Sequence, residues 1–196
     1  MGYSFLVIDI ETTGLDPQLD EILEIGIVKV KLPNERITPI FNHTIKPKQI
    51  PLTCWAFENS TLNRELIQDS MPIDIYRKEL QELFLKYDCV SYNTEFDFSF
   101  LNKVGFQFKY IMSDPMHFAP DILKIPNKRG GYKWPKVQEC LYYFDILEIE
   151  PHRALDDAKL EAEIMLRLID LGYFSSYFSR KRPRSRRYTK RIKKRK

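Results

Sequence analysis

The sequence predicts a mixed α/β fold, a β-sheet flanked by helices, from three observations. The first is a run that is apolar on both faces, at residues 4–10, and is therefore typical of a central strand. Two further predicted strands follow it, and the remaining chain alternates helices with short strands. With 196 residues, 43% of them hydrophobic, the chain is long enough for one domain with its own core.

The N-terminal part supplies three of the expected strands. Residues 22–32 alternate apolar and polar side chains and follow a turn-like stretch at 12–20. Residues 37–47 form the third strand after a turn at Pro33 and Asn34. Residues 51–70 are irregular, and we expect short helical pieces there.

The remaining part alternates helices and short strands. Pro72 is expected to begin a helix, because apolar side chains recur after it at helical spacing. The further expected elements are a strand at 89–93, a helix at 95–104, a strand at 110–114, a loop at 116–134, a helix at 134–144 and a last helix at 153–171 that ends at Gly172.

Cysteine content and hydropathy bound the class of protein. The three cysteines are far apart and lack metal-ligand spacing, so we expect reduced structural residues. No apolar run approaches the length of a membrane span, and the first ten residues lack the basic start of a signal peptide. We therefore expect a soluble intracellular protein without a membrane partner, located in the cytoplasm or, if its basic end acts as an import signal, in the nucleus.

The chain is divided into an acidic domain, residues 1–178, and a basic tail, residues 179–196. Of the 31 basic residues 12 lie in the tail, which has no acid, and this leaves 19 against 27 acidic ones in the domain. The tail lacks apolar periodicity and is expected to be disordered when free. Targeting and nucleic-acid binding are compatible interpretations of it. Its basic residues are Arg180, Lys181, Arg182, Arg184, Arg186, Arg187, Lys190, Arg191, Lys193, Lys194, Arg195 and Lys196.

Two carboxylates end the first strand. In FLVIDIETTGL, residues 5–15, Asp9 and Glu11 are two residues apart, so both side chains leave the same face of the strand. Phe5 and Val7 share that face, which favours burial, and an unpaired buried charge is costly. The alternative is a strand end that faces solvent.

Two helices each place an acid on an apolar face. Asp97 begins the apolar stripe of its helix, although it could also be a first-turn acid that only complements the helix dipole. In the last helix, a rotation of about 100° per residue puts Asp156 on the polar arc and Asp157 on the apolar arc. Glu161 also falls on the apolar arc, and the sequence offers no partner for it.

Asp9, Glu11, Asp97 and Asp157 are therefore candidate metal ligands. Two unit charges about 4 Å apart repel by roughly 4 kcal/mol at an effective dielectric of about 20, so four carboxylates in one pocket need protons or cations. Oxygen ligands without a Cys or His cluster favour Mg²⁺ or Mn²⁺. Two such ions would neutralise the pocket and suit in-line displacement at phosphorus.

His152 lies five residues before Asp157, just ahead of the last helix. Beside a pocket of carboxylates and metal ions, its imidazole is a candidate general base for a water nucleophile. A purely structural histidine is the alternative.

Three segments that carry these residues resemble, in order, the motifs of the DnaQ-like 3′→5′ exonucleases, the histidine subclass of the DEDD nucleases. They are VIDIETTGL (7–15), YNTEFD (92–97) and HRALDDA (152–158). The resemblance covers about residues 4–172. The family includes the proofreading epsilon subunit of bacterial DNA polymerase III. The resemblance implies a ribonuclease H-like fold, four acidic metal ligands, two divalent cations and His152 as the general base.

The resemblance also implies a pocket for the terminal nucleotide. Thr12, Thr13 and Gly14 match the turn that meets the 3′-hydroxyl, and Leu15 matches an apolar wedge against the last bases. We expect two further residues, Asn93 and Phe96, to shape the pocket, with a helix cap and an ordinary core residue as the respective alternatives.

Two residues depart from the family pattern. Tyr92 stands where the family often has His or a small residue, and Glu95 adds a charge near the second motif. Neither affects the five core residues, so we expect changes in substrate preference rather than loss of activity.

The expected function is a metal-dependent 3′→5′ exonuclease that releases nucleoside 5′-monophosphates from single-stranded or frayed 3′ ends, of DNA rather than RNA, in repair or proofreading. A polymerase or another replication or repair protein is the expected partner, although the sequence contains no recognisable polymerase-binding segment. The alternatives are an exoribonuclease, a ribonuclease H-like endonuclease, and a catalytically silent nucleic-acid-binding protein on the same scaffold.

Overall fold

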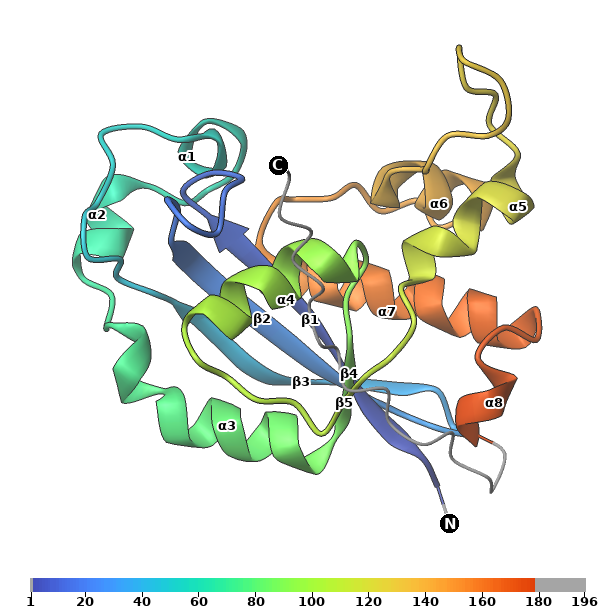
Figure 1. Ribbon diagram of the computed structural model, residues 1–196, viewed down its shortest axis with the longest axis horizontal. Coiled ribbons are helices and arrows are strands. Elements are labelled where there is room, and N and C mark those ends of the chain that lie inside the picture. Colours follow the sequence, from blue (N-terminus) through green and yellow to red (C-terminus); the bar gives the residue numbers. More distant parts are fainter. Residues whose placement is uncertain (1, 179–196) are drawn as a thin grey trace, which may run out of the picture.

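A computed structural model describes residues 2–178, and its centre is a mixed five-stranded sheet (Figure 1). The strand order is β3-β2-β1-β4-β5, in which β1 runs antiparallel to β2 and parallel to β4. The strands are β1 (Ser4–Thr12), β2 (Ile22–Lys31), β3 (Arg36–Thr44), β4 (Asp88–Val90) and β5 (Tyr110–Ile111). The predicted fold class is therefore confirmed, whereas the predicted tail lies outside the described residues.

Helices cover both faces of the sheet. The longer ones are α3 (Arg77–Lys86), α4 (Thr94–Lys103), α6 (Val137–Tyr143) and α7 (Ala154–Asp170). The shorter ones are α1 (Trp55–Asn59), α2 (Arg64–Gln68), α5 (Ala119–Leu123) and α8 (Ser175–Phe178), with 3₁₀ turns at η1 (Ile73–Ile75) and η2 (Pro115–His117). No helix in this part of the chain combines the length and apolar content needed to cross a membrane.

The alternation of β1 divides the core into two layers. Phe5 and Val7 pack with the apolar face of α7, whereas Leu6 and Ile8 pack with α3 and α4 on the other side. All four side chains are buried. Because β1 is covered on both faces, it reads as a continuous apolar run, and the same alternation sends Asp9 toward the α7 side.

Two predicted strands and the helix predicted from Pro72 are shorter than expected, and the turns that begin α4 and η2 explain the two strands. The strand predicted at 89–93 ends at Val90, because Asn93 takes a left-handed conformation (φ 64°) to begin α4. The strand predicted at 110–114 pairs only through β5, because the Asp114 carboxylate accepts bonds from three backbone N–H groups at the start of α4 and of η2. The helix predicted from Pro72 is a 3₁₀ turn, and α3 begins only at Arg77.

The segment predicted as a loop at 116–134 instead contains the end of η2 and all of α5. The last helix ends as predicted. Gly172 (φ 90°) follows it, and the N–H groups of Gly172 and Tyr173 donate to the carbonyls of Ile169 and Leu168. This pair of bonds satisfies carbonyls that a helix end leaves open.

Candidate active site

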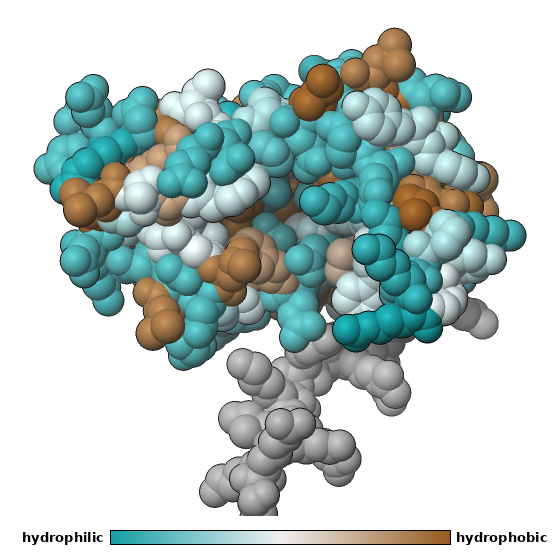
Figure 2. Space-filling model, turned by 90° about the horizontal axis from the view of Figure 1, so that it is seen from above, coloured by the Kyte–Doolittle hydropathy of each residue, from teal (hydrophilic) through white to brown (hydrophobic). Residues whose placement is uncertain are grey.

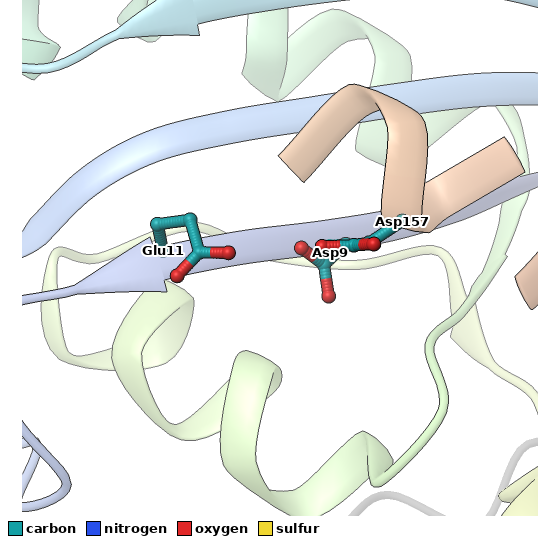
Figure 3. A group of neighbouring side chains, drawn as sticks. All are labelled: Asp9, Glu11 and Asp157. Carbon is teal, nitrogen blue, oxygen red and sulfur yellow. The ribbon is translucent and has the colours of Figure 1, made fainter. Parts of the chain in front are cut away.

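Three carboxylates converge where β1 meets the first turn of α7. One carboxylate oxygen from each of Asp9, Glu11 and Asp157 lies within 4.8 Å of the other two (Figure 3). Asp9 and Glu11 leave β1 on the same side, as their spacing predicts. Asp157 is 5% exposed whereas its neighbour Asp156 is exposed, so the assignment of the two helix faces is also confirmed.

A glycine lets α7 reach the sheet at this point. Gly26 of β2 is paired with Asp9 across the sheet. A Cβ atom at residue 26 would lie 2.2 Å from the backbone of Ala154 and Leu155, at the start of α7. The helix therefore rests on the bare backbone of β2, and this places Asp157 over β1. The signal in the sequence is a lone glycine inside an alternating strand.

A buried ion pair holds the start of α7 in place. Glu24, which pairs with Glu11 across the sheet, is 1% exposed. Its carboxylate accepts bonds from the Arg153 Nε and Nη2 atoms, at 2.6–3.1 Å, and from the Ala154 N–H at 2.9 Å. Sequence reasoning missed both partners, although an acid in the middle of an apolar strand run was a usable signal.

Asp97 lies beside the group of three rather than within it. Its Oδ1 atom accepts a bond from the backbone N–H of Ile10 at 3.2 Å. Pairing between β1 and β4 stops at Val7 and Val90, so this part of the β1 edge has no strand partner there. The buried carboxylate of Asp97 satisfies that edge next to Asp9, so this acid does more than complement the dipole of its helix.

Glu161 provides a further buried carboxylate near the site, and the structure supplies its partner. It lies one turn after Asp157, is 5% exposed, and accepts a bond from the Tyr92 N–H at 3.0 Å. The second motif is thus attached to α7 through the residue that departs from the family pattern. After burial, the charge of Glu161 raises the pKa of Asp9 more than any other neighbouring charge does.

Burial, and after it the crowding of charges, raises the pKa values of these acids. Burial, followed by the charge of Asp157, raises the pKa of Glu11 to about 8. Burial raises the pKa of Asp97 to about 8, and burial followed by Glu150 raises that of Asp157 to about 7. The pKa of Asp9 is also raised well above its ordinary value, first by burial. Without cations the site therefore favours protonated carboxyl groups near neutral pH.

One oxygen of the group has no partner among residues 2–178. The Oδ1 atom of Asp157 is buried and accepts no hydrogen bond there. Buried polar atoms in proteins are almost always paired, so an orphaned carboxylate oxygen needs a ligand. The candidate metal ligands of this group are all carboxylate oxygen atoms, without Cys or His. Such a set of ligands fits a hard divalent cation such as Mg²⁺ or Mn²⁺.

His152 lies on the segment that leads into α7, outside the group of converging oxygen atoms. Its backbone is left-handed (φ 52°), and its ring forms a T-shaped contact with the Trp55 ring, with centroids 4.8 Å apart. Gln138 braces the preceding segment, because it exchanges hydrogen bonds with Glu150 at 3.0 Å in both directions. These contacts fix the loop that carries His152.

The turn after β1 is closed by its own side chains. The Thr12 hydroxyl donates to the Gly14 carbonyl at 2.6 Å, and the Thr13 hydroxyl donates to Asp20 at 3.0 Å and accepts from the Glu21 N–H. Leu15 at its tip is 83% exposed. Asp20, which sequence reasoning missed, therefore shapes the turn that presents Leu15 to solvent.

The remaining two predicted pocket residues differ from each other. Asn93 is exposed and makes no capping hydrogen bond with its side chain, which disfavours a simple helix cap. Phe96 is half-buried and packs on Phe100 with ring centroids 5.1 Å apart.

The face at the top of Figure 1, drawn in Figure 2, is hollowed near its middle.

Comparison with known proteins gives the family. Residues 6–165 match the RNase_T model, described as an exonuclease. The chain therefore belongs to this exonuclease family, which confirms the resemblance carried by the three motifs and the expectation of an exonuclease. The three cysteines are free, as expected for reduced structural residues.

The similar curated proteins are much longer than this chain. The PolC-type DNA polymerase III of Thermotoga petrophila is 30% identical over 173 residues, which are 86% of this chain and 12% of that protein. The 3′-5′ exonuclease DinG of Bacillus subtilis is 27% identical, over 85% of this chain and 18% of that protein. This chain thus spans about an eighth of the length of the PolC-type relatives.

Solved structures confirm the ribonuclease H-like fold. The nuclease domain of 3′hExo, a DEDDh family member solved with rAMP, has a TM-score of 0.67 at 18% identity and covers 86% of this chain and 92% of that chain. Exonuclease I of E. coli in complex with a dT13 oligonucleotide has a TM-score of 0.67 at 14% identity, over 89% of this chain and 44% of that chain.

Proposed function

We propose that residues 1–178 form a metal-dependent 3′→5′ exonuclease that removes nucleoside 5′-monophosphates from single-stranded or frayed 3′ ends. The observation that carries the proposal is the convergence of Asp9, Glu11 and Asp157, in which one buried Asp157 oxygen has no partner among the described residues. The three motifs and the family membership support it.

The acids would hold two divalent cations, Mg²⁺ or Mn²⁺. Asp9, Glu11 and Asp157 would bind one, and Asp9 would bind the second, with Asp97 contributing through a water molecule. When bound, such ions supply an activated water and offset negative charge on the leaving oxygen. The raised pKa values of Glu11 and Asp157 support this, because cations relieve the repulsion that otherwise favours protonation.

His152 would act as the general base. Its imidazole would accept a proton from the attacking water, while the bond between phosphorus and the 3′ oxygen of the preceding nucleotide breaks. The T-shaped contact with Trp55 and the bracing of the segment by Gln138 support this role, because they limit the movement of the ring.

The turn after β1 would hold the terminal nucleotide. Leu15 would pack against the last bases, and Thr12, Thr13 and Gly14 would lie near the 3′-hydroxyl. The exposure of Leu15 supports this, because a solvated apolar side chain on a braced turn is free to contact a base. Asn93 and Phe96 would complete the pocket.

DNA is the proposed substrate, with a polymerase or another replication or repair protein as partner. The support is the similarity of this chain to one segment of PolC-type DNA polymerase III. Because solved neighbours contain rAMP in one case and a dT13 oligonucleotide in another, an exoribonuclease is the second candidate.

A digestion panel tests the proposal. It uses 5′-labelled single- and double-stranded DNA and RNA, each with Mg²⁺, Mn²⁺ or EDTA, and each with a free or blocked 3′ end. We expect stepwise shortening from the free 3′ end that requires metal, with mononucleotide products. Cutting of the blocked substrate would identify an endonuclease instead, and binding without hydrolysis would identify a silent binding protein.

A further inference from the structure

A protruding hairpin connects α5 with α6 and has no role in the proposed chemistry. This segment, residues 124–136, is called the basic hairpin below. Pro126 and Tyr132 form a bridge across it, and the Lys133 N–H donates to the Ile125 carbonyl at 3.0 Å. In Figure 1 it extends beyond α5 and α6 at the upper right, at the same end of the molecule as the turn after β1.

The basic hairpin reverses the charge of the domain that carries it. Residues 124–136 contain five basic side chains and no acid, in a domain where acids outnumber basic residues. Lys128 and Arg129 at the tip are exposed and form no ion pair within the described residues. Of the five, Lys133 does pair, with Glu139. The five are Lys124, Lys128, Arg129, Lys133 and Lys136.

Exposed aromatic rings interleave with these charges. Tyr132 is 47% exposed and Trp134 is 63% exposed, while the Trp134 ring packs on His117 with centroids 5.5 Å apart. A ring supported on one side and open on the other is suited to stacking on a nucleobase. Exposed aromatic rings between basic residues are typical of surfaces that bind single-stranded nucleic acid.

The base of the hairpin is attached to the catalytic motifs. Tyr92, which is 7% exposed, donates from its hydroxyl to the Pro135 carbonyl at 2.6 Å, and its N–H donates to Glu161. The hairpin therefore has a fixed position relative to the second motif and α7. Tyr92 is one of the two residues that depart from the family pattern. Its hydroxyl bonds to a residue 43 positions away, and this role in holding the hairpin accounts for the tyrosine.

We propose that the basic hairpin binds the single strand on the 5′ side of the terminal nucleotide. Lys128 and Arg129 contact phosphates, Trp134 stacks on a base, and Tyr92 acts as a positioning residue. The physical reason is that an acidic domain repels a polyanion, so attraction must come from a local basic surface. The inference rests on the proposed function, because it assigns the path of that enzyme's substrate.

The test compares two double variants of the chain of residues 1–196, so that the tail is present in both. Lys128→Ala with Arg129→Ala removes the tip charges. Lys31→Ala with Arg36→Ala removes an exposed Lys from the end of β2 and an exposed Arg from the start of β3, at the opposite end of β2 from Glu24. Fluorescence anisotropy with labelled dT20 in EDTA measures binding without hydrolysis.

We expect only the hairpin variant to bind more weakly. The slope of log affinity against log salt concentration should be smaller in magnitude by about 1.4, since two phosphate contacts are lost and each contributes about 0.7 on single strands. Trp134→Ala should weaken binding by roughly 5- to 150-fold, corresponding to about 1–3 kcal/mol per stacked base, and Trp134→Phe should retain most of it. Equal salt slopes for the two double variants would overturn the proposal.

Hydrolysis of a small substrate separates this inference from the proposed function. The p-nitrophenyl ester of thymidine 5′-monophosphate occupies the catalytic centre alone, so the hairpin variant should hydrolyse it at the unmodified rate while its KM for dT20 rises. A slower reaction with the ester would refute a role limited to the upstream strand. If the unmodified protein hydrolyses neither substrate, the proposed function fails, and anisotropy still decides the hairpin.

Discussion

Asp156 and Asp157 are neighbours in the sequence with different surroundings. Asp156 forms an exposed ion pair with Lys159 on the same helix, at 2.7 Å. Asp157 is buried, carries an unpaired oxygen, and converges with Asp9 and Glu11. A rotation of one residue along the helix is the whole difference between a surface pair and a candidate metal ligand.

Replacing each aspartate by asparagine should therefore change kcat to very different extents. We expect Asp157→Asn to lower kcat by at least about 100-fold, because loss of a metal ligand removes several kcal/mol of charge stabilisation. Asp156→Asn should change kcat less than about twofold, since exposed pairs contribute little. Mononucleotide release measures both, and equal losses would refute the assignment of helix faces.

The raised pKa values predict how stability depends on pH. Folded Asp157 and Glu11 have pKa values of about 7 and about 8, above the values near 4 expected in the unfolded chain. The folded state thus holds these protons more tightly, so their contribution to stability is present at about pH 4 and is lost as the pH rises toward about 8.

In EDTA, the Tm should therefore fall as the pH is raised from about 5 to about 8.5, and Mg²⁺ should reverse much of that fall because it replaces the protons. Asp157→Asn should show a smaller fall and a smaller response to Mg²⁺. Thermal unfolding followed by circular dichroism measures both, and a Tm that ignores Mg²⁺ at about pH 8.5 would contradict a metal site.

At the scale of the element, the position of α7 depends on β2 rather than on its own sequence. Gly26 leaves the space, and Glu24 holds Arg153 and the Ala154 N–H at the start of the helix. Glu24 is 1% exposed, whereas the Arg153 side chain is 27% exposed. The carboxylate is therefore the partner that cannot tolerate the loss of its counter-charge.

Arg153→Ala should destabilise the protein by about 3 kcal/mol, because it leaves a buried carboxylate without its ion pair. The matched control is Lys159→Ala on the same helix, where the exposed pair with Asp156 should contribute less than about 1 kcal/mol. Urea unfolding measures both free energies. Equal losses would show that the Glu24–Arg153 pair does not hold the helix.

Prediction of the elements succeeded where the pattern was local and failed at their ends. The alternation of β1 and the periodicity of α7 gave both elements and their inner faces. The shortened strands at 89–93 and 110–114 followed from Asn93 and Asp114, which take part in a turn that joins two separate elements. Periodicity contains no information about such a long-range hydrogen bond.

On the scale of the whole molecule, an acidic segment, residues 1–178, precedes a basic one. The hairpin and the tail are separate basic segments, and the tail lies outside the described residues. Removing residues 180–196 should flatten the log–log salt slope for single-stranded binding by about 0.7 for each phosphate contact that is lost. An unchanged slope would leave targeting as the role of the tail.

The sequence by itself determined the fold class, the shared face of Asp9 and Glu11, and the inward direction of Asp157. These features depend on backbone geometry, which repeats every two residues in a strand and every 3.6 in a helix. Tertiary structure alone decided the contact of Asp97 with Ile10, the Glu24–Arg153 pair, and the attachment of Tyr92 to Glu161 and Pro135. Those contacts join residues 43 to 129 positions apart, and packing, rather than local periodicity, brings them together.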